Sequence, residues 1–182
     1  MVSLYDKKIS LSIARKTIEQ FFTQKKITEK NLPLILQEKG SCFVTLTKDN
    51  KLQGCCGTVF PFQSLAKDIQ TNALQAAFFD PRFPPLSQEN LSLISIELSI
   101  LSLPYARQIT TEKDLLEMLN PHVDGVVLQW KEYKSTFLPT VWSTFPKKED
   151  FLTALKIKAG LPKNFWENDM EIFTYTVSSW KD

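Results

Sequence analysis

The clearest alternation of apolar and polar residues in the chain lies between Leu93 and Leu103. Apolar side chains take every second position of this segment, with polar ones between them: Ile94, Ser95, Ile96, Glu97, Leu98, Ser99 and Ile100. Successive side chains of a β-strand point to opposite faces of a sheet, so the pattern predicts a strand with one buried face. The fold therefore has to contain a β-sheet with one covered face.

A β-hairpin is predicted upstream of this strand. Residues 41–47 alternate and are rich in β-branched side chains, which favours a strand. Asp49 and Asn50 follow, and both residue types tolerate turn conformations. Residues 52–59 then return as the second arm. This pairing predicts that Cys42 lies near the stretch from Cys55 to Gly57.

Helices are expected where apolar residues recur at steps of three and four, over Ser10–Lys26 and Ser64–Phe79. Ser64 is a plausible N-cap of the second helix, and Asp68 falls in its first turns, where the helix dipole favours negative charge. In the second half of the chain, helices are predicted over Thr111–Leu119 and Lys147–Ala159. Strands are predicted there over Val126–Trp130, Lys134–Leu138 and Met170–Trp180.

Hairpins dominate this order, and helices come between groups of strands. The fold class expected is therefore α+β, a mostly antiparallel sheet with helices packed on it. Residues 1–182 are predicted to form a single domain or two intimately packed lobes. The proline-rich stretch Pro81–Pro85 is the best candidate for a seam between lobes.

The composition narrows the functional classes. A net charge of +2 argues against a dedicated nucleic-acid-binding protein, and the pairs Lys25-Lys26 and Lys147-Lys148 are interpreted as solvated faces. The chain has no apolar run long enough to span a membrane and no signal peptide at its N-terminus. Its three cysteines are an odd number, which favours free thiols in a cytoplasmic protein.

Gly54 and Gly57 bracket Cys55 and Cys56, although the chain has only five glycines. Two glycines so close in a strand indicate a bulge, or a backbone that something must approach closely. Exposed amides there could bind an anion, and Cys55 is the candidate nucleophile or ligand if the site is chemical. The alternative is that these cysteines are small buried apolar residues. No cofactor is expected, and the single histidine, His122, offers neither a recognisable Cys-His pair nor a zinc-binding spacing.

Three charged residues complete the candidate site. Asp80 and Arg82 stand two residues apart on a segment stiffened by prolines. Arg82 could bind a carboxylate or phosphate, or it could form a structural ion pair with Asp80 or Glu97. Glu97 stands on the polar side of the predicted strand, where a carboxylate faces either solvent or a cleft.

Leu52-Gln53-Gly54-Cys55-Cys56-Gly57 resembles the signature Leu-Arg-Gly-Cys-Ile-Gly of the AMMECR domain family. The resemblance continues in order along most of the chain, in Asn72-Ala73, Ala76-Ala77-Phe78, Asp80 to Leu86, Ile96 to Leu101, Asp124 to Leu128, Thr136 to Trp142, Phe151-Leu152 and Lys158 to Pro162. Taken together, these stretches form a specific pattern, although each one alone is common.

The resemblance implies an α+β fold with a larger and a smaller lobe, and a signature that lies near a cleft. It also implies an association with Memo-like and radical-SAM proteins, and a biochemical activity that is not settled. Two residues depart from the signature. Gln53 replaces an arginine that could bind an anion or activate Cys55, and Cys56 replaces an isoleucine.

Two functions follow from these residues. In the first, the protein is an enzyme or enzyme subunit that acts on a small molecule or a modified partner. Cys55 is then the nucleophile or covalent anchor, the amides of Gly54 and Gly57 hold an anionic group, and Arg82 with Glu97 positions the substrate. In the second, the same surface is a non-catalytic binding or adaptor site for a protein partner.

Overall fold

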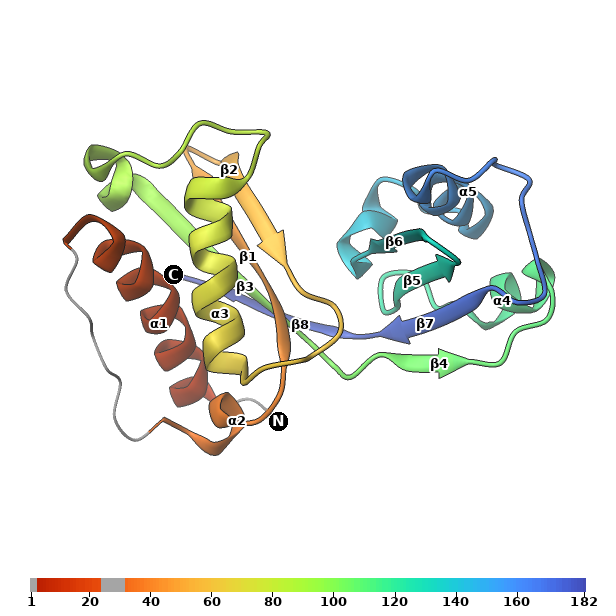
Figure 1. Cartoon of the computed structure of the whole chain (residues 1–182), viewed down its shortest axis with the longest axis horizontal. Coiled ribbons are helices and arrows are strands. Elements are labelled where there is room, and N and C mark those ends of the chain that lie inside the picture. The colour runs from red at the N-terminus through yellow and green to blue at the C-terminus, as the bar shows by residue number, and fades with distance from the viewer. Residues whose placement is uncertain (1–2, 24–31) are drawn as a thin grey trace. The chain divides into compact units, whose positions relative to one another are not determined.

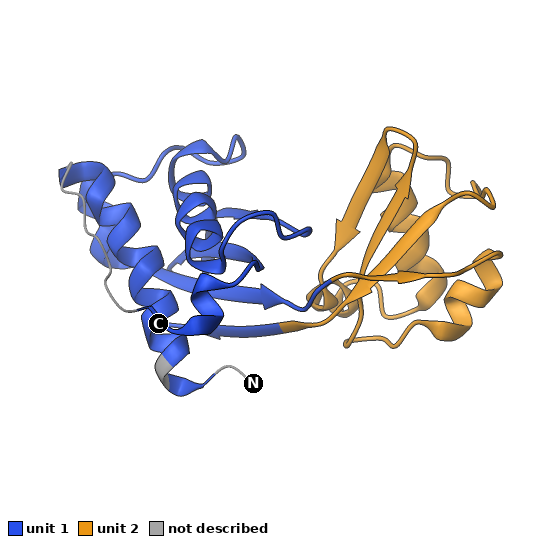
Figure 2. Ribbon diagram, turned by 60° about the horizontal axis from the view of Figure 1, so that its bottom comes forward, with its two compact units in different colours: residues 1–103, 178–182 blue, residues 104–177 orange. Residues whose placement is uncertain are grey.

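The structure is a computed structural model that describes residues 3–23 and 32–182. The chain divides into two compact units, shown in Figure 2: unit 1 spans residues 1–103 and 178–182, and unit 2 spans residues 104–177. Each unit has its own sheet and its own apolar core. Five pairs of neighbouring strands in the two sheets are antiparallel, and helices pack with these sheets, so the predicted α+β class is confirmed.

The expected seam at Pro81–Pro85 is wrong, because this stretch lies within unit 1. The chain passes between the units at Leu103 and again at Val177. Hydrogen bonds fold the proline-rich segment back onto unit 1 instead, from Phe83 N to Asp80 O and from Leu86 N to Ala77 O.

Unit 1 contains most of the helices and the predicted hairpin. Its elements are α1 (Leu4–Thr23), α2 (Leu34–Gln37), β1 (Ser41–Lys48), β2 (Lys51–Gly57), α3 (Leu65–Leu74), the π-helical turn η1 (Gln75–Phe79), the 3-10 helix η2 (Gln88–Leu93), β3 (Ile94–Leu101) and β8 (Val177–Lys181). The strand order is β2-β1-β3-β8. In Figure 1, α1 and α3 lie side by side on one face of this sheet.

The hairpin forms as predicted. Asp49 and Asn50 connect β1 to β2 with φ angles of 51° and 59°. Two consecutive residues with positive φ make a turn whose twist matches that of paired strands. The register places Val44 opposite Cys56 and is irregular next to Leu46. Cys42 O accepts a hydrogen bond from Thr58 N at 3.0 Å, so Cys42 does lie beside the end of the signature.

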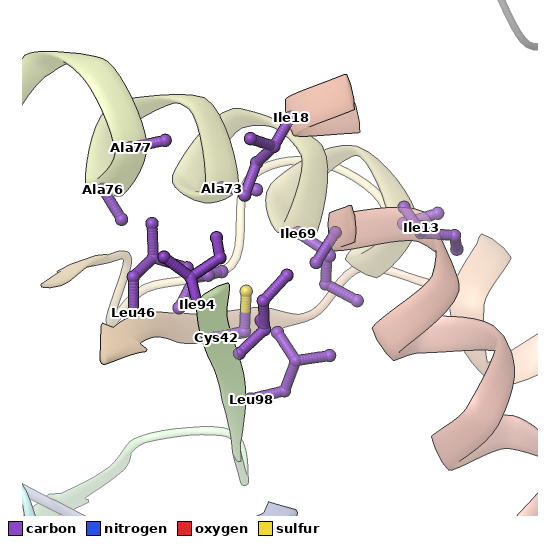
Figure 3. Packing of buried hydrophobic residues seen from close by; sticks show 14 of the residues in the cluster. Ile13, Ile18, Cys42, Leu46, Ile69, Ala73, Ala76, Ala77, Ile94 and Leu98 are labelled. Atoms are coloured by element: carbon purple, nitrogen blue, oxygen red, sulfur yellow. The ribbon is translucent and has the colours of Figure 1, made fainter. Parts of the chain in front are cut away.

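The core of unit 1 forms between the sheet and the two long helices. Figure 3 shows Cys42 and Leu46 of β1 and Leu98 of β3 directed toward Ile13 and Ile18 of α1 and toward Ile69 and Ala73 of α3. The alternation from Ile94 to Ile100 is thereby explained, because its apolar positions face these helices.

The two predicted helices of unit 1 are largely confirmed, with changes at their ends. The first begins at Leu4, earlier than expected, and Lys25 and Lys26 lie outside the described residues. Ser64 caps α3 as predicted, accepting a hydrogen bond from Lys67 N. The last turn of the second predicted helix is π-helical, and it ends at Asp80.

Unit 2 contains a second, smaller antiparallel sheet. Its elements are β4 (Tyr105–Arg107), α4 (Glu112–Met118), β5 (Gly125–Trp130), β6 (Tyr133–Phe137), the 3-10 helix η3 (Pro139–Ser143), α5 (Lys148–Ala159) and β7 (Glu171–Tyr175), with strand order β4-β7-β5-β6. The core includes the stacked rings of Trp142 and Phe151, whose centroids are 3.7 Å apart. Gly160, at a φ of 88°, ends α5.

The final predicted strand is two strands. Residues 170–180 divide at Thr176 into β7, which joins the sheet of unit 2, and β8, which joins the sheet of unit 1. The short strand β4 was not predicted, since three residues are too few to show an alternation.

Candidate functional site

Cys55, Thr45 and Glu97 form a row across the sheet of unit 1. Thr45 of β1 is paired with Cys55 of β2 on one side and with Glu97 of β3 on the other. Their neighbours Val44 and Leu46 are buried against the helices, so the row stands on the opposite face of the sheet, which we call the open face. All three residues of the row are partly buried. Thr45 Oγ1 lies 3.3 Å from Cys55 Sγ.

The three cysteines occupy different environments. Cys42 is fully buried, and this burial raises the pKa of its thiol well above the ordinary value. Cys56 faces the helix-covered side and packs against the core, and burial raises the pKa of its thiol as well. Cys55 is the cysteine on the open face. The packing interpretation therefore holds for Cys42 and Cys56, and the candidate nucleophile is the thiol that differs from them.

Asp80 and Arg82 hold the main chain of Cys55 at the outer edge of β2. Asp80 Oδ2 accepts hydrogen bonds from Cys55 N at 2.9 Å and from Arg82 Nη2 at 2.7 Å. Arg82 Nε donates to Asp80 Oδ1 at 2.9 Å, and Arg82 Nη2 also donates to Cys55 O at 3.2 Å. Of the alternatives for Arg82, the structure contains the ion pair with Asp80.

The charges at this edge differ in exposure. The Asp80 side chain is 4% exposed and that of Arg82 is 58% exposed. Hydrogen bonding from the Arg82 guanidinium holds the pKa of the Asp80 carboxyl well below its usual range. The guanidinium also interacts electrostatically with the thiols of Cys55 and Cys56. One exposed cation is therefore fixed beside the candidate nucleophile.

The two glycines allow close contacts on opposite faces of β2. A Cβ atom at Gly54 would lie 1.9 Å from the carbonyl oxygen of Ala76 in η1, and a Cβ atom at Gly57 would lie 2.2 Å from the ring of Phe43. Both sequence interpretations are observed: another part of the chain approaches each glycine closely, and the register of β2 against β1 shifts by one residue next to Gly54. Glycine at these positions lets η1 and the Phe43 ring touch the strand.

The amides of Gly54 and Gly57 were expected to hold an anion together. In the structure the two amides have different surroundings. Because Cys55 N points outward to Asp80, the amides of its neighbours Gly54 and Cys56 point toward β1. The Gly54 amide therefore belongs to the sheet. The Gly57 amide lies next to the Cys56 thiol, and its binding of an anion stays a prediction.

A buried polar network beneath the hairpin was missed in the sequence. Asp68 of α3 is fully buried and accepts hydrogen bonds from Cys42 N and Asn72 Nδ2, both at 3.0 Å, and from Gln63 Nε2 at 3.1 Å. Asn72 also donates to Thr58 Oγ1 at 3.2 Å. The spacing of Asp68 and Asn72 by four residues, on the apolar side of a predicted helix, was the available signal.

Other candidate groups are placed elsewhere. His122 belongs to unit 2, in the turn before β5, whereas Cys55 belongs to unit 1. Among residues 3–23 and 32–182, no cluster of three or more His, Cys, Asp or Glu side chains is arranged to hold a metal ion. No described helix has the length and apolar character needed to cross a membrane.

Comparisons with known proteins find the same family over most of the chain. The sequence model of the AMMECR1 family matches residues 11–180. A protein of Methanocaldococcus jannaschii is 33% identical over 173 residues, which cover 91% of this chain and 84% of that protein. A protein of Thermotoga maritima is 34% identical over 173 residues, which cover 92% and 94%. The crystal structure of an uncharacterized protein from Pyrococcus horikoshii matches with a TM-score of 0.90 at 28% identity, covering 100% of this chain and 93% of that one.

Proposed function

The chain belongs to the AMMECR1 family, and on that premise we propose that it is an enzyme, or a subunit of one, that acts at the open face of unit 1. Its substrate is a small molecule or a modified partner, and Cys55 is the nucleophile or covalent anchor. The reducing cytoplasm keeps its thiols free for such a role.

The placement of Cys55 carries this proposal. Its sulfur is the one cysteine sulfur on the open face, and both polar groups of its main chain are held by the pair of Asp80 and Arg82. A nucleophile whose backbone is fixed in this way keeps a constant direction toward a bound substrate. Cys42 is fully buried, and Cys56 packs on the helix-covered side of the sheet, so neither shares this position.

The neighbouring side chains suggest how a substrate is held. Arg82 is exposed and presents donors of its guanidinium to solvent, which suits an anionic group of the substrate. Glu97 stands two strand spacings from Cys55, about 10 Å, and suits a cationic or hydroxyl group. Asp80 touches no substrate in this scheme. It is a positioning residue that orients Arg82 and the Cys55 main chain.

Alkylation of the native protein tests the proposal. Iodoacetamide is added at neutral pH, and the modification of each cysteine is followed in time by peptide mass spectrometry. Cys55 is expected to react at least about tenfold faster than Cys56 and Cys42, because reaction requires an accessible thiolate. Equal, slow reaction of all three thiols would contradict the proposal.

A second measurement separates chemistry from simple accessibility. The protein is incubated with the small-molecule fraction of a cell extract, and its intact mass is compared with that of Cys55→Ala. An adduct present on the wild type and absent from Cys55→Ala supports a covalent role. Thr45→Val is the matched control, since it removes the hydroxyl beside the sulfur and leaves the sulfur in place.

The alternative, a non-catalytic docking site on the same face, is favoured by one observation. Among the described side chains, the polar group in contact with Cys55 Sγ is the Thr45 hydroxyl, which is a poor general base. A Memo-like or radical-SAM protein is the partner proposed for this case. Thr45→Arg should abolish its recovery in a pull-down, and recovery equal to that of the wild type would count against docking.

A further inference from the structure

The outward face of α5 in unit 2 forms one wall of an apolar groove. Helical steps of three and four bring Asp150, Ala154, Ile157 and Lys158 onto this face. The buried residues of α5, among them Phe151 and Leu155, lie on its other side. Phe137 of β6 and Phe145 after η3 complete the groove, which has a volume of about 690 Å³.

The middle of the groove is apolar and exposed. Ile157 is 59% exposed on the helix side. The rings of Phe137 and Phe145 lie nearly parallel, with centroids 6.2 Å apart. An exposed apolar surface with a polar rim is typical of an interaction site.

The charges at the two ends of the groove are opposite. Asp150 stands four residues before Ala154, and Lys158 stands four residues after it. A two-fold axis that passes through Ala154 perpendicular to the helix axis therefore exchanges the acidic position with the basic one. A surface with this property is complementary to itself, which is the requirement for a two-fold symmetric interface.

We propose that the groove binds a second copy of this chain, with the two α5 helices packed antiparallel across Ala154. Asp150 of each copy then meets Lys158 of the other, so that two identical ion pairs form. The small Ala154 side chain allows the helix axes to approach to about 8 Å. Ile157 of each copy covers the apolar middle of the groove.

Lys158 is already oriented for this contact. Its Nζ donates a hydrogen bond to Thr136 O at 2.9 Å and lies 5.0 Å from the centre of the Phe137 ring. Less side-chain freedom is lost when a group held in this way forms an ion pair.

The expected dimer is weak. The helix has 12 residues and a length of about 18 Å, so the paired faces are smaller than the roughly 800 Å² per partner of a standard stable interface. Dissociation in the micromolar range is expected, and the oligomeric state should change with concentration.

Sedimentation velocity of the full chain, from about 1 μM to about 500 μM, tests the proposal. The wild type should pass from monomer to dimer over this range. Ile157→Glu should leave a monomer at every concentration. Asp150→Lys and Lys158→Asp should each weaken the dimer about tenfold or more, because each places like charges opposite one another twice.

The double variant that combines Asp150→Lys with Lys158→Asp gives the sharpest result. It exchanges the charges and should restore the dimer, since each pair forms again in reverse. Glu149→Lys is the matched control: it makes the same charge change on an exposed α5 residue beside the groove, and it should leave the dimer unchanged.

Thermal melts confirm that each variant is folded. The proposal is overturned by a wild type that stays monomeric throughout, by a dimer that survives Ile157→Glu, by a double variant no better than the single ones, or by a Glu149→Lys as damaging as Asp150→Lys.

Discussion

On the helix-covered side of the unit 1 sheet, Asp68 binds the main-chain amide of Cys42, whereas at the outer edge Asp80 binds that of Cys55. Both carboxylates are shielded from water. Asp68 also accepts hydrogen bonds from the neutral side-chain amides of Asn72 and Gln63, whereas Asp80 also accepts them from the exposed guanidinium of Arg82. The inner contact fixes the hairpin to the helix, and the outer one can respond to pH and to bound anions.

The largest effect is expected at the contact between β2 and η1. In Gly54→Ala the new methyl group would collide with the main-chain oxygen of Ala76, which can move only with the whole π-helical turn. A loss of about 3 kcal/mol or more in the free energy of unfolding is expected, measured by urea denaturation.

Gly57→Ala is the matched comparison for this variant. There the methyl group meets the ring of Phe43, a side chain on the open face that can rotate away. A smaller loss is expected than in Gly54→Ala. Equal losses would show that the closeness of η1 to the strand is not what Gly54 provides.

The next largest effect concerns the inner carboxylate. Asp68→Ala leaves Cys42 N and the amide of Asn72 without this acceptor in a buried environment, which should cost about 2–3 kcal/mol. Asp80→Ala should cost less, since Arg82 can turn to water. The comparison between the two aspartates fails if urea denaturation gives Asp80→Ala the greater loss.

The outer carboxylate should make stability depend on pH. The pKa of Asp80 is lowered in the folded protein by Arg82, so its contribution is fully present above the ordinary aspartate pKa of about 3.9 and is lost as pH falls below it. Because Arg82 is exposed and screened, a contribution of about 1 kcal/mol is expected.

Asp80→Asn is the reference for this measurement, because it keeps the size of the side chain and removes its charge. The difference in unfolding free energy between wild type and Asp80→Asn should be constant from about pH 7 to about pH 5 and should shrink toward about pH 3. A difference that stays constant over the whole range would contradict a charged role for Asp80.

The smallest effect is expected for the cysteine of the open face. Cys55→Ala should change the free energy of unfolding by less than about 0.5 kcal/mol, because the partly buried Cys55 side chain lies outside the apolar core of unit 1. Cys42→Ala, in the core, should cost about 1–2 kcal/mol because it leaves a small cavity. Thermal unfolding of the two variants measures this difference. A greater loss of stability in Cys55→Ala than in Cys42→Ala would show that Cys55 is a packing residue.

The sequence was sufficient for features that depend on neighbouring residues. Alternation located β3, and Asp49 and Asn50 located the turn between β1 and β2, which pairs Lys48 with Lys51. That turn alone would pair Thr45 with Gly54. The register shift next to Leu46 brings Cys55 opposite Thr45 instead, so the row of Cys55, Thr45 and Glu97 depends on this irregularity and on the pairing of β1 with β3. The second pairing joins residues about fifty positions apart, and no local pattern specifies it.

Contacts between distant elements could not be predicted. Nothing in residues 75–79 distinguishes a π-helical turn from the α-helix before it, although this turn places Asp80 at Cys55. Residues 170–180 also have a strand-like pattern on both sides of Thr176. This pattern does not reveal that the chain changes there from the sheet of unit 2 to the sheet of unit 1.

The change of sheet at Thr176 makes unit 2 an insertion within unit 1. During synthesis on the ribosome, β3 is complete well before β8, and all of residues 104–177 are made in between. The edge of β3 that β8 later occupies is therefore open while unit 2 is being produced. An unpaired strand edge is prone to wrong pairing, so the length of the inserted unit sets how long a nascent chain carries this open edge.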